Sequence, residues 1–377
     1  MTVKKKFNIK NYINYIIIVL ALIILFILDS SGILKRSTIN LLPKIAYSII
    51  LAVSLNLVVG FLGELSLGHA GFMCVGAYLG TFFSVFLNEI IGNSLICLIV
   101  SMIVGGIVAA FFGFIIGLPA LRLKGDYLAI VTLAFGEIVR NIFKNLELFG
   151  GAMGYKTDAV RVKDRTLYIV GFVVLLIVMI LIQNLIRSKH GRAITAIRDN
   201  EIAAKAMGIN VTFYKLFVFI IAAFFAGIAG VIYGHYTTPV IYTNFDYNYS
   251  IEILVMVVIG GIGSMTGSII SATAITIINF ILQKNLTGDL AAVRLIVYAL
   301  LLVAIVIFSN APALKPIKEK FSIRRLFKAK EETIRDDDAA WNRIKSKIKM
   351  DEVLSVDVNN VNSAYTPDGK EDKKGDK

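Results

Sequence analysis

The sequence RSKHGRAITAIRDNEIAAKAMG, residues 187–208, is a polar stretch between two long apolar runs, residues 167–186 and 213–233. Its basic residues are Arg187, Lys189, Arg192, Arg198 and Lys205, against two acidic residues, Asp199 and Glu201. Short loops with an excess of Lys and Arg stay on the cytoplasmic side of a membrane. The stretch is therefore predicted to be a cytoplasmic loop between two membrane spans.

Apolar residues recur in this loop at roughly helical spacing, with charges between them. They are Ile194, Ile197 and Ala204, with Ile202 and Met207 near the edges of the stripe. The pattern predicts one short amphipathic helix over residues 194–206 that offers its apolar stripe to something outside the membrane. Lipid headgroups and a groove on another protein both remain open as the partner.

The composition of the whole chain predicts a membrane protein with many spans. The chain has 377 residues, of which 57% are hydrophobic, and its mean hydropathy is +0.76. A span needs about 20 apolar residues, and eight or nine such runs are visible, some of them broken. We therefore expect an all-α polytopic membrane protein with about 8–10 transmembrane helices, including broken or re-entrant helices and the short helix of the cytoplasmic loop. The net charge of +13 fits anionic lipid and loop topology better than nucleic acid.

Charge and hydropathy divide the chain into four segments. Residues 1–11 are lysine-rich and predicted to be cytoplasmic, and residues 12–310 form the transmembrane domain, with the cytoplasmic loop at 187–212. Residues 311–350 read as a basic amphipathic segment on the inner leaflet, and residues 351–377 as a disordered polar tail. Both termini are then cytoplasmic.

Several polar residues fall inside or beside apolar runs. Glu137 and Arg140 are three positions apart in one span, so they lie on one helix face and can pair. The pair is either a structural ion pair or part of a polar face toward a translocation path, with Thr132 and Asn141. His69, in a glycine-rich stretch between two spans, lies either at the water interface or on the same path.

Two further segments leave alternatives open. Residues 250–282 are too many for one simple crossing, and Gly260, Gly261 and Gly263 interrupt them, which predicts two half-helices that meet in mid-membrane. One tilted, glycine-kinked span is the alternative. Residues 233–250 are rich in tyrosine, which favours an interfacial belt over a docking platform for a binding protein.

The chain has few features of an enzyme. It contains no G-x-x-x-x-G-K-[ST] phosphate loop, no H-E-x-x-H metal motif and no G-x-S-x-G elbow. Its two cysteines lie in apolar runs without metal-ligand spacing. Active transport by this chain would need energy from another subunit or from an ion gradient.

Four motifs in one order carry a resemblance to a known family. They are SLNLVVGFLGELSLGHAGF (54–72), GDYLAIVTLAFGEI (125–138), RDNEIAAKAMG (198–208) and GGIGSMTGS (260–268). Together they resemble the permeases of branched-chain amino-acid ABC importers, and the second motif is similar to the LivM-type subunit. The third is similar to the EAA loop, which in that family forms the coupling helix that docks on the ATPase.

The resemblance implies a set of partners and site residues. It implies a second homologous permease, two cytoplasmic ATPases, an extracytoplasmic binding protein, a bacterial plasma-membrane location, no nucleic acid and no cofactor on this chain, with ATP and Mg²⁺ used by the ATPases. The implied ATPase-coupling residues are Ile194, Ile197, Arg198, Asp199, Glu201, Ala203, Ala204 and Gly208. The predicted path residues are His69, Thr132, Glu137, Arg140, Asn141, Gly260, Gly261 and Gly263.

Two rival functions stay open. The same architecture serves relatives that import urea, amides or other amino acids. An ion-driven secondary transporter, with Glu137 and Arg140 as its coupling pair, is the second rival.

Overall fold

The computed structural model describes Ser31, residues 36–123, 125–160 and 162–285, and Ala299, Leu300 and Val303. The chain divides into two units, Met1–Asn310 and Ala311–Lys377, and the described residues all lie in the first. The predicted first span at 12–28, most of a last apolar run at 291–308, and the segments 1–11, 311–350 and 351–377 lie outside the described residues.

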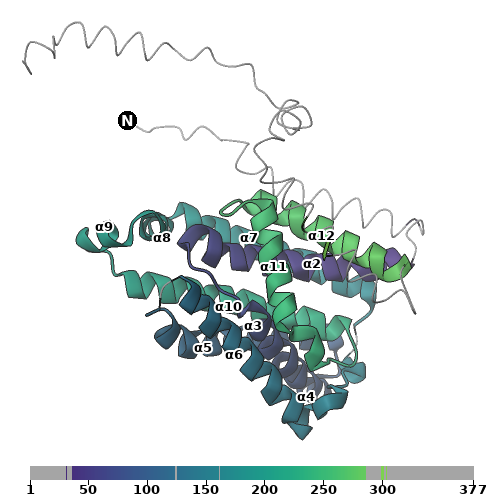
Figure 1. The fold of residues 1–377 in the computed structure, drawn as a ribbon. Helices are drawn as coiled ribbons and strands as arrows, with labels where there is room; N and C mark the ends of the chain where they lie inside the picture. Colours follow the sequence, from purple (N-terminus) through teal and green to yellow (C-terminus); the bar gives the residue numbers. More distant parts are fainter. Residues whose placement is uncertain are drawn as a thin grey trace, which may run out of the picture. The chain divides into compact units, whose positions relative to one another are not determined.

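The described part is almost entirely helical, as predicted. Its α-helices are α2 (Arg36–Asn56), α3 (His69–Val75), α4 (Thr81–Ile91), α5 (Ser94–Ala120), α6 (Asp126–Asn145), α7 (Asp164–Arg187), α8 (Lys189–Asp199), α9 (Glu201–Ala206), α10 (Val211–Tyr236), α11 (Tyr247–Gly260) and α12 (Met265–Asn285) (Figure 1). Two π-helical segments, η2 (Leu57–Leu62) and η3 (Gly76–Gly80), extend α2 and join α3 to α4. The described residues form no strand, only one isolated bridge between Tyr155 and Val240.

Six of the described helical segments are long and apolar enough to cross a membrane. They are Arg36–Leu62, His69–Ile91, Ser94–Ala120, Asp164–Arg187, Val211–Tyr236 and Met265–Asn285. Helix α6 has 20 residues and is therefore about 30 Å long, but it carries more charge than these six. The protein is thus an all-α, multi-pass membrane protein.

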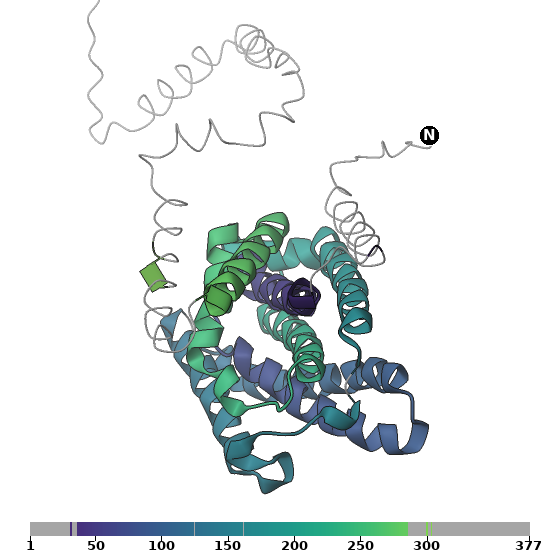
Figure 2. The same ribbon diagram turned by 90° about the vertical axis from the view of Figure 1, so that its right-hand side faces the viewer.

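Helix α2 lies in the middle of the bundle. It packs against α7, α10, α11 and α12, and Figure 2 looks along it, with α12 and α7 on either side. From Leu41 to Asn56 all its residues except Lys44 are buried. A helix that is apolar on all faces belongs inside a bundle. The apolar run in the sequence predicts a span over residues 44–62, whereas the helix begins at Arg36 and continues through Pro43.

Glycines bring the helices around α10 into backbone contact. A Cβ on Gly230 would lie 2.1 Å from the Met73 carbonyl oxygen, and one on Gly76 would lie 2.2 Å from the Gly227 carbonyl oxygen. Membrane helices associate through such close packing, because lipid gives no hydrophobic drive between them. Gly227 and Gly230 in the apolar run 213–233 predict such a close-packing face from the sequence, and the structure confirms it.

Two interruptions break the regular helices. Residues 63–68 form an irregular link between η2 and α3. Gly261 and Gly263 separate α11 from α12 with φ values of 93° and 79°, which L-residues rarely adopt. The predicted break is therefore present, and the single kinked span is wrong.

The break does not lie in mid-membrane. Gly263 contacts Gly60, near the end of η2, and Arg198 of α8. Helix α12 is long enough to cross by itself, whereas α11, with 14 residues, is about 21 Å long. The two helices therefore turn at the end of the bundle where the 187–212 loop lies.

The 187–212 loop contains two helices instead of the one predicted. Asn200 is extended, with φ of −158°, and its side-chain oxygen accepts a hydrogen bond from the Ala203 N–H (3.0 Å). Asn competes with helical hydrogen bonding in this way and favours N-caps. Asn200 thus ends α8 and starts α9.

We expect Gly230→Ala to destabilise the protein, because the new methyl group would meet backbone atoms of α3. Overpacking of this kind costs about 1–3 kcal/mol. Gly136→Ala, on α6, is the matched control, since its Cβ would make only ordinary contacts of 3.8 Å or more. Thermal unfolding of the detergent-purified protein measures both. Equal unfolding midpoints for the two variants would contradict the close packing.

Candidate functional site

The 187–212 loop presents opposite faces to the bundle and to the surroundings. Ile194, Ile197 and Ala204 are buried in the core of the chain itself. Ile202 and Met207, by contrast, are 81% and 82% exposed. The prediction that Ile194, Ile197 and Ala204 face an external partner is therefore wrong for this structure, since α8 packs on η2 and α10. Whether they act in coupling through that packing stays a prediction.

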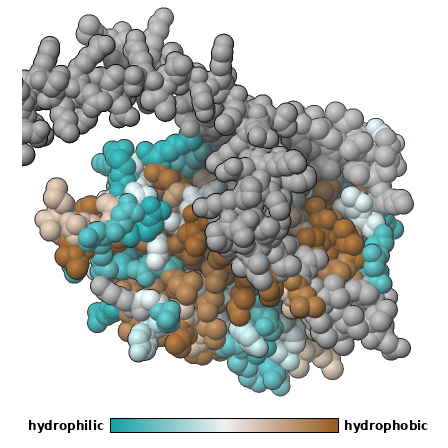
Figure 3. All heavy atoms as spheres, turned by 45° about the horizontal axis from the view of Figure 1, so that its top comes forward, coloured by the Kyte–Doolittle hydropathy of each residue, from teal (hydrophilic) through white to brown (hydrophobic). Residues whose placement is uncertain are grey.

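Figure 3 shows how polarity varies over one face of the molecule. Hydrophilic side chains gather toward the side where α8 and α9 lie, and hydrophobic side chains cover the middle of this face. Ile202 and Met207 are exposed, and their neighbours along the chain include the charged Glu201 and Lys205. Gly208, with φ of 81°, ends α9 in the left-handed conformation that favours glycine at this position.

A buried lysine ties the loop to the bundle. Lys215, in the second turn of α10, is 3% exposed. Its ammonium group forms ion pairs with Glu64, just after η2, and with Glu201 of α9 (3.2 Å). A buried charge is costly unless it is paired. One cation therefore holds two carboxylates from segments far apart in the sequence.

Glu201 was a predicted coupling residue, but Lys215 and Glu64 were missed. The available signal was Lys215 itself, as the lone charge of the apolar run 213–233, at its third position.

Arg198 makes the second contact between loop and bundle. It donates a hydrogen bond to the Gly60 carbonyl oxygen (3.1 Å) and pairs with Asp199 (2.9 Å). A Cβ on Gly63 would lie 2.7 Å from the Arg198 side chain, so the small residue there makes room for it. Arg198 and Asp199, two of the predicted coupling residues, are therefore paired with each other. Ala203, another predicted coupling residue, is exposed on α9.

The side chain of Asn56 connects this region to the break between α11 and α12. Its Oδ1 accepts from the Gly263 N–H (2.9 Å), and its Nδ2 donates to the Ser264 carbonyl (3.1 Å) and to the Ser268 hydroxyl (2.9 Å). Gly60 lies one turn after Asn56. The contacts form a continuous series from α8 through η2 to the break, which includes the predicted Gly260, Gly261 and Gly263.

The predicted path residues do not form one cluster. Glu137 and Arg140 pair on α6 (2.7 Å), each with 25% of its side chain exposed, and Asn141 donates to the Glu137 carbonyl (2.8 Å). These residues lie on the outer face of α6, where Glu137 and Asn141 line an open hollow of about 520 Å³. The predicted pairing is confirmed.

His69 and Thr132 have structural partners in the interior. The His69 Nε2 lies 2.8 Å from the Ser54 hydroxyl. That hydroxyl donates to the Leu51 carbonyl, so the imidazole N–H is the donor between them. Thr132 Oγ1 accepts from the Leu67 N–H (3.0 Å). Both residues are at most 2% exposed, so neither lines an open path in this structure.

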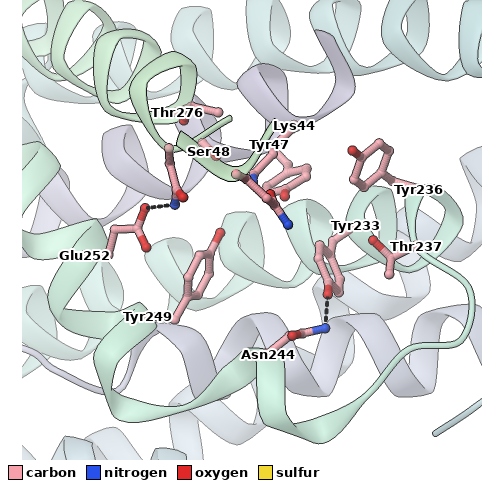
Figure 4. A pocket seen from close by; sticks show the side chains of 12 residues that line it. Lys44, Tyr47, Ser48, Tyr233, Tyr236, Thr237, Asn244, Tyr249, Glu252 and Thr276 are labelled. Carbon is pink, nitrogen blue, oxygen red and sulfur yellow. Dashed lines mark hydrogen bonds between the residues drawn. The ribbon is translucent and has the colours of Figure 1, made fainter. Parts of the chain in front are cut away.

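A polar cavity of about 440 Å³ lies at the other end of α10 (Figure 4). Tyr233, Tyr236 and Tyr249 line it, so this part of the tyrosine-rich segment faces a cavity instead of forming only an interfacial belt. Tyr247 is 49% exposed, and Tyr242 lies under the Lys144 ammonium (5.6 Å to the ring centre). This cavity was not predicted, because its lining comes from five separate segments.

Comparisons with known proteins identify the family. Residues 37–306 match the family described as "Branched-chain amino acid transport system / permease component". The chain is 35% identical, over 275 and 278 residues, to the high-affinity branched-chain amino acid transport system permease proteins LivM of Salmonella typhimurium and Escherichia coli. These matches cover 64% of this chain and 63% of each relative. A probable LivM of Methanocaldococcus jannaschii is 29% identical over 270 residues, which cover 62% of this chain and 78% of the relative.

No solved structure matches the chain. The family match spans 270 positions, the difference between 306 and 37 with both ends counted, which is well over half of the 377 residues. It includes all eleven described α-helices except the first residue of α2. The chain therefore belongs to the branched-chain amino acid transport system permease family.

Proposed function

We propose that this chain is the permease subunit of an ATP-driven importer for branched-chain amino acids. The names of the LivM relatives support the substrate class. The proposed coupling to an ATPase rests on the 187–212 loop, which has one face fixed to the bundle and one face exposed. Its inner face is fixed to the bundle by Arg198 and Glu201, while Ile202 and Met207 stay exposed. This is the arrangement that a helix docking in a groove of another protein requires.

The proposed mechanism starts at the exposed face of α9. A cytoplasmic ATPase receives Ile202 and Met207 in an apolar groove, hydrolyses ATP with its own Mg²⁺, and moves α9 as it closes. Because Lys215 binds Glu201 and Glu64 together, motion of α9 is transmitted to α10 and η2. Through Gly60 and Asn56 it reaches the turn between α11 and α12. The bundle then reorients around the translocation path.

The outer face of α6 is the proposed contact with a second, homologous permease. The exposed residues of α5 include Ile103, Ile107 and Phe111, which suit lipid. The exposed face of α6 instead mixes apolar side chains with Asn141, Asn145 and the Glu137 side chain, a quarter of which is exposed. Polar groups are costly against hydrocarbon and face protein or water. The path between the two permeases then runs along this face.

In this proposal an extracytoplasmic binding protein delivers the substrate, and both termini are cytoplasmic. Helix α7 separates the 146–163 loop from the 187–212 loop, so the binding protein docks at the opposite end from the ATPases. An ion-coupled mechanism has less support, because Arg140 already neutralises Glu137 at 2.7 Å. The same architecture could import urea or amides, and the uptake test below distinguishes these substrates from branched-chain amino acids.

The double variant Ile202→Ser/Met207→Ser should lose the ATPase subunits, because it removes the exposed apolar contact without touching the inner face. Co-purification from membranes of the fully assembled importer measures this, and retention is expected to fall about tenfold or more. Ala206→Ser, an exposed position on the same helix, is the control. ATPase subunits that remain bound to the double variant would rule out this docking face.

Arg198→Ala should leave assembly intact but uncouple hydrolysis from transport, because the link from α8 to the Gly60 carbonyl is lost. Leucine uptake per ATP hydrolysed, in proteoliposomes with the binding protein, is expected to fall at least about fivefold. Arg192→Ala, exposed on the same helix, should behave like the wild type.

A wild-type complex that takes up urea or an amide but no leucine, isoleucine or valine would refute the substrate assignment.

Ile138→Cys and Ile107→Cys test the α6 contact, since their side chains are 59% and 57% exposed, on α6 and α5 respectively. The two native cysteines are buried and react little. A short crosslinker with one thiol-reactive and one photoreactive end should, after illumination, join Ile138→Cys to the second permease and leave Ile107→Cys uncrosslinked. The reverse pattern would place the interface on α5.

A further inference from the structure

The cavity at the far end of α10 is closed on one side by aromatic rings and carries opposite charges on its lining. The lining comes from α2 (Lys44, Tyr47, Ser48), α10 and its end (Tyr233, Tyr236, Thr237), the short 3₁₀ helix η7, Tyr242–Phe245 (Asn244), α11 (Tyr249, Glu252) and α12 (Thr276, Asn279, Gln283). Its volume of about 440 Å³ is in the range of small-molecule sites, about 300–1,000 Å³.

The position of the cavity relative to the 187–212 loop follows from three helices. Helix α10 begins after the loop and reaches the cavity at Tyr233 and Tyr236. Helix α2 ends beside the loop and reaches the cavity at Lys44, in its first half. Helix α12 begins beside the loop and reaches it at Asn279 and Gln283, in its last turns. The cavity therefore lies at the extracytoplasmic end of the bundle in the proposed topology.

One polar group on the cavity wall has no hydrogen-bond partner among the residues that the structure describes. Thr276 is 2% exposed, and its hydroxyl makes no hydrogen bond among the described residues. Buried hydroxyl groups normally have a partner, and an unpaired one costs free energy. Other wall groups are already engaged: Asn279 donates to Glu252 (3.2 Å), and Asn244 donates to the Tyr233 hydroxyl (2.7 Å). Figure 4 shows these two bonds on opposite sides of the cavity.

The charges of the lining select the class of ligand. Glu252 is an acidic residue in an apolar helix, α11, and Lys44 is the one residue of α2 between Leu41 and Asn56 that is not buried. Both line the same cavity. A neutral sugar would desolvate both charges without neutralising either, and a metal cation would meet the Lys44 ammonium. A small zwitterion, with one ammonium and one carboxylate, matches both.

The aromatic side of the cavity suits an aliphatic side chain. The rings of Tyr47 and Tyr233 meet edge to face with their centres 5.6 Å apart, and Tyr236 lies 6.2 Å from Tyr47. Tyrosine presents an apolar ring together with a polar hydroxyl group. The same wall can therefore contact both a hydrocarbon group and the polar head of a ligand.

We propose that this cavity is a binding site for one free α-amino acid, with Glu252 binding the ammonium group and Lys44 and the Thr276 hydroxyl binding the carboxylate. The proposal rests on the proposed function, because it locates on this chain a site for the transported substrate. It makes the permease more than a passive path: the substrate is held after it leaves the binding protein and before the bundle reorients.

The test is equilibrium binding of radiolabelled L-leucine to the detergent-purified complex, without the binding protein. Saturable binding is expected. An excess of unlabelled leucine should displace the label, whereas 3-methylbutylamine and 4-methylpentanoate, which each lack one of the two charged groups, should not. Wild-type protein that binds no leucine overturns the proposal, as does equal displacement by either single-charge analogue.

Variants locate the binding. Glu252→Gln is expected to raise the Kd at least about tenfold, because it removes a charge-assisted contact, and Thr276→Val about threefold or more. Thr273→Val is the matched control, since the Thr273 hydroxyl is bonded to the Ile269 carbonyl of its own helix (2.7 Å). Thermal unfolding midpoints within the range of the control establish that the variants fold.

Leucine binding that is unchanged in both Glu252→Gln and Thr276→Val would overturn the site. Failure of this inference is distinguishable from failure of the proposed function. Wild-type ATP-driven uptake of leucine, with no binding to the isolated complex, refutes only the site. Absence of that uptake refutes the function itself.

Discussion

The side-chain amide of Asn56 is the contact on which the rest of this structure depends. Where a helix is interrupted against the interior of a bundle, the freed backbone groups need partners, since buried N–H and C=O groups are rarely left unpaired. Asn56 supplies an acceptor to Gly263 and donors to Ser264 and Ser268. The turn between α11 and α12 is thereby fixed to the most buried helix of the bundle.

The same region receives the two contacts of the 187–212 loop. Gly60, one turn after Asn56, accepts from Arg198, and Glu64, one turn further, binds Lys215. Three consecutive turns of one segment thus hold α11, α12, α8 and α10. Close glycine packing of Gly76 and Gly230 then fixes α3 and η3 against α10. The loop is thus joined to the bundle at the segment that holds the break, while Ile202 and Met207, on and just after α9, stay exposed.

Local patterns in the sequence predicted the features that depend on neighbouring residues. Apolar runs gave the all-α class, Gly227 and Gly230 gave a packing face, and a spacing of three gave the Glu137–Arg140 pair. Asn200 is also a signal in the sequence, because Asn favours helix N-caps and so predicts a new helix start there. The apolar periodicity continues past Asn200, however, and for this reason one helix was predicted instead of two.

The remaining features depend on contacts between distant segments. A stripe such as Ile194, Ile197 and Ala204 shows that a face is apolar, but not whether it packs on its own chain or on another. The pairing of Lys215 with Glu64 requires that the end of η2 lie beside α10. The tyrosine-lined cavity likewise exists only because α2, α10, α11 and α12 converge there. The spacing of residues within one segment predicts neither the Lys215–Glu64 ion pair nor the cavity.

The length of α10 has a consequence for how far a small movement reaches. Its 26 residues make a rod of about 39 Å, with Lys215 near one end and Tyr233 and Tyr236 at the other. A tilt of about 5° around its first turn would carry the far end sideways by about 3 Å, which is close to one hydrogen-bond length. Such a tilt would make helix α10 a lever, because a shift too small to rearrange the ion pairs at its base would open or close contacts among the tyrosines at its other end.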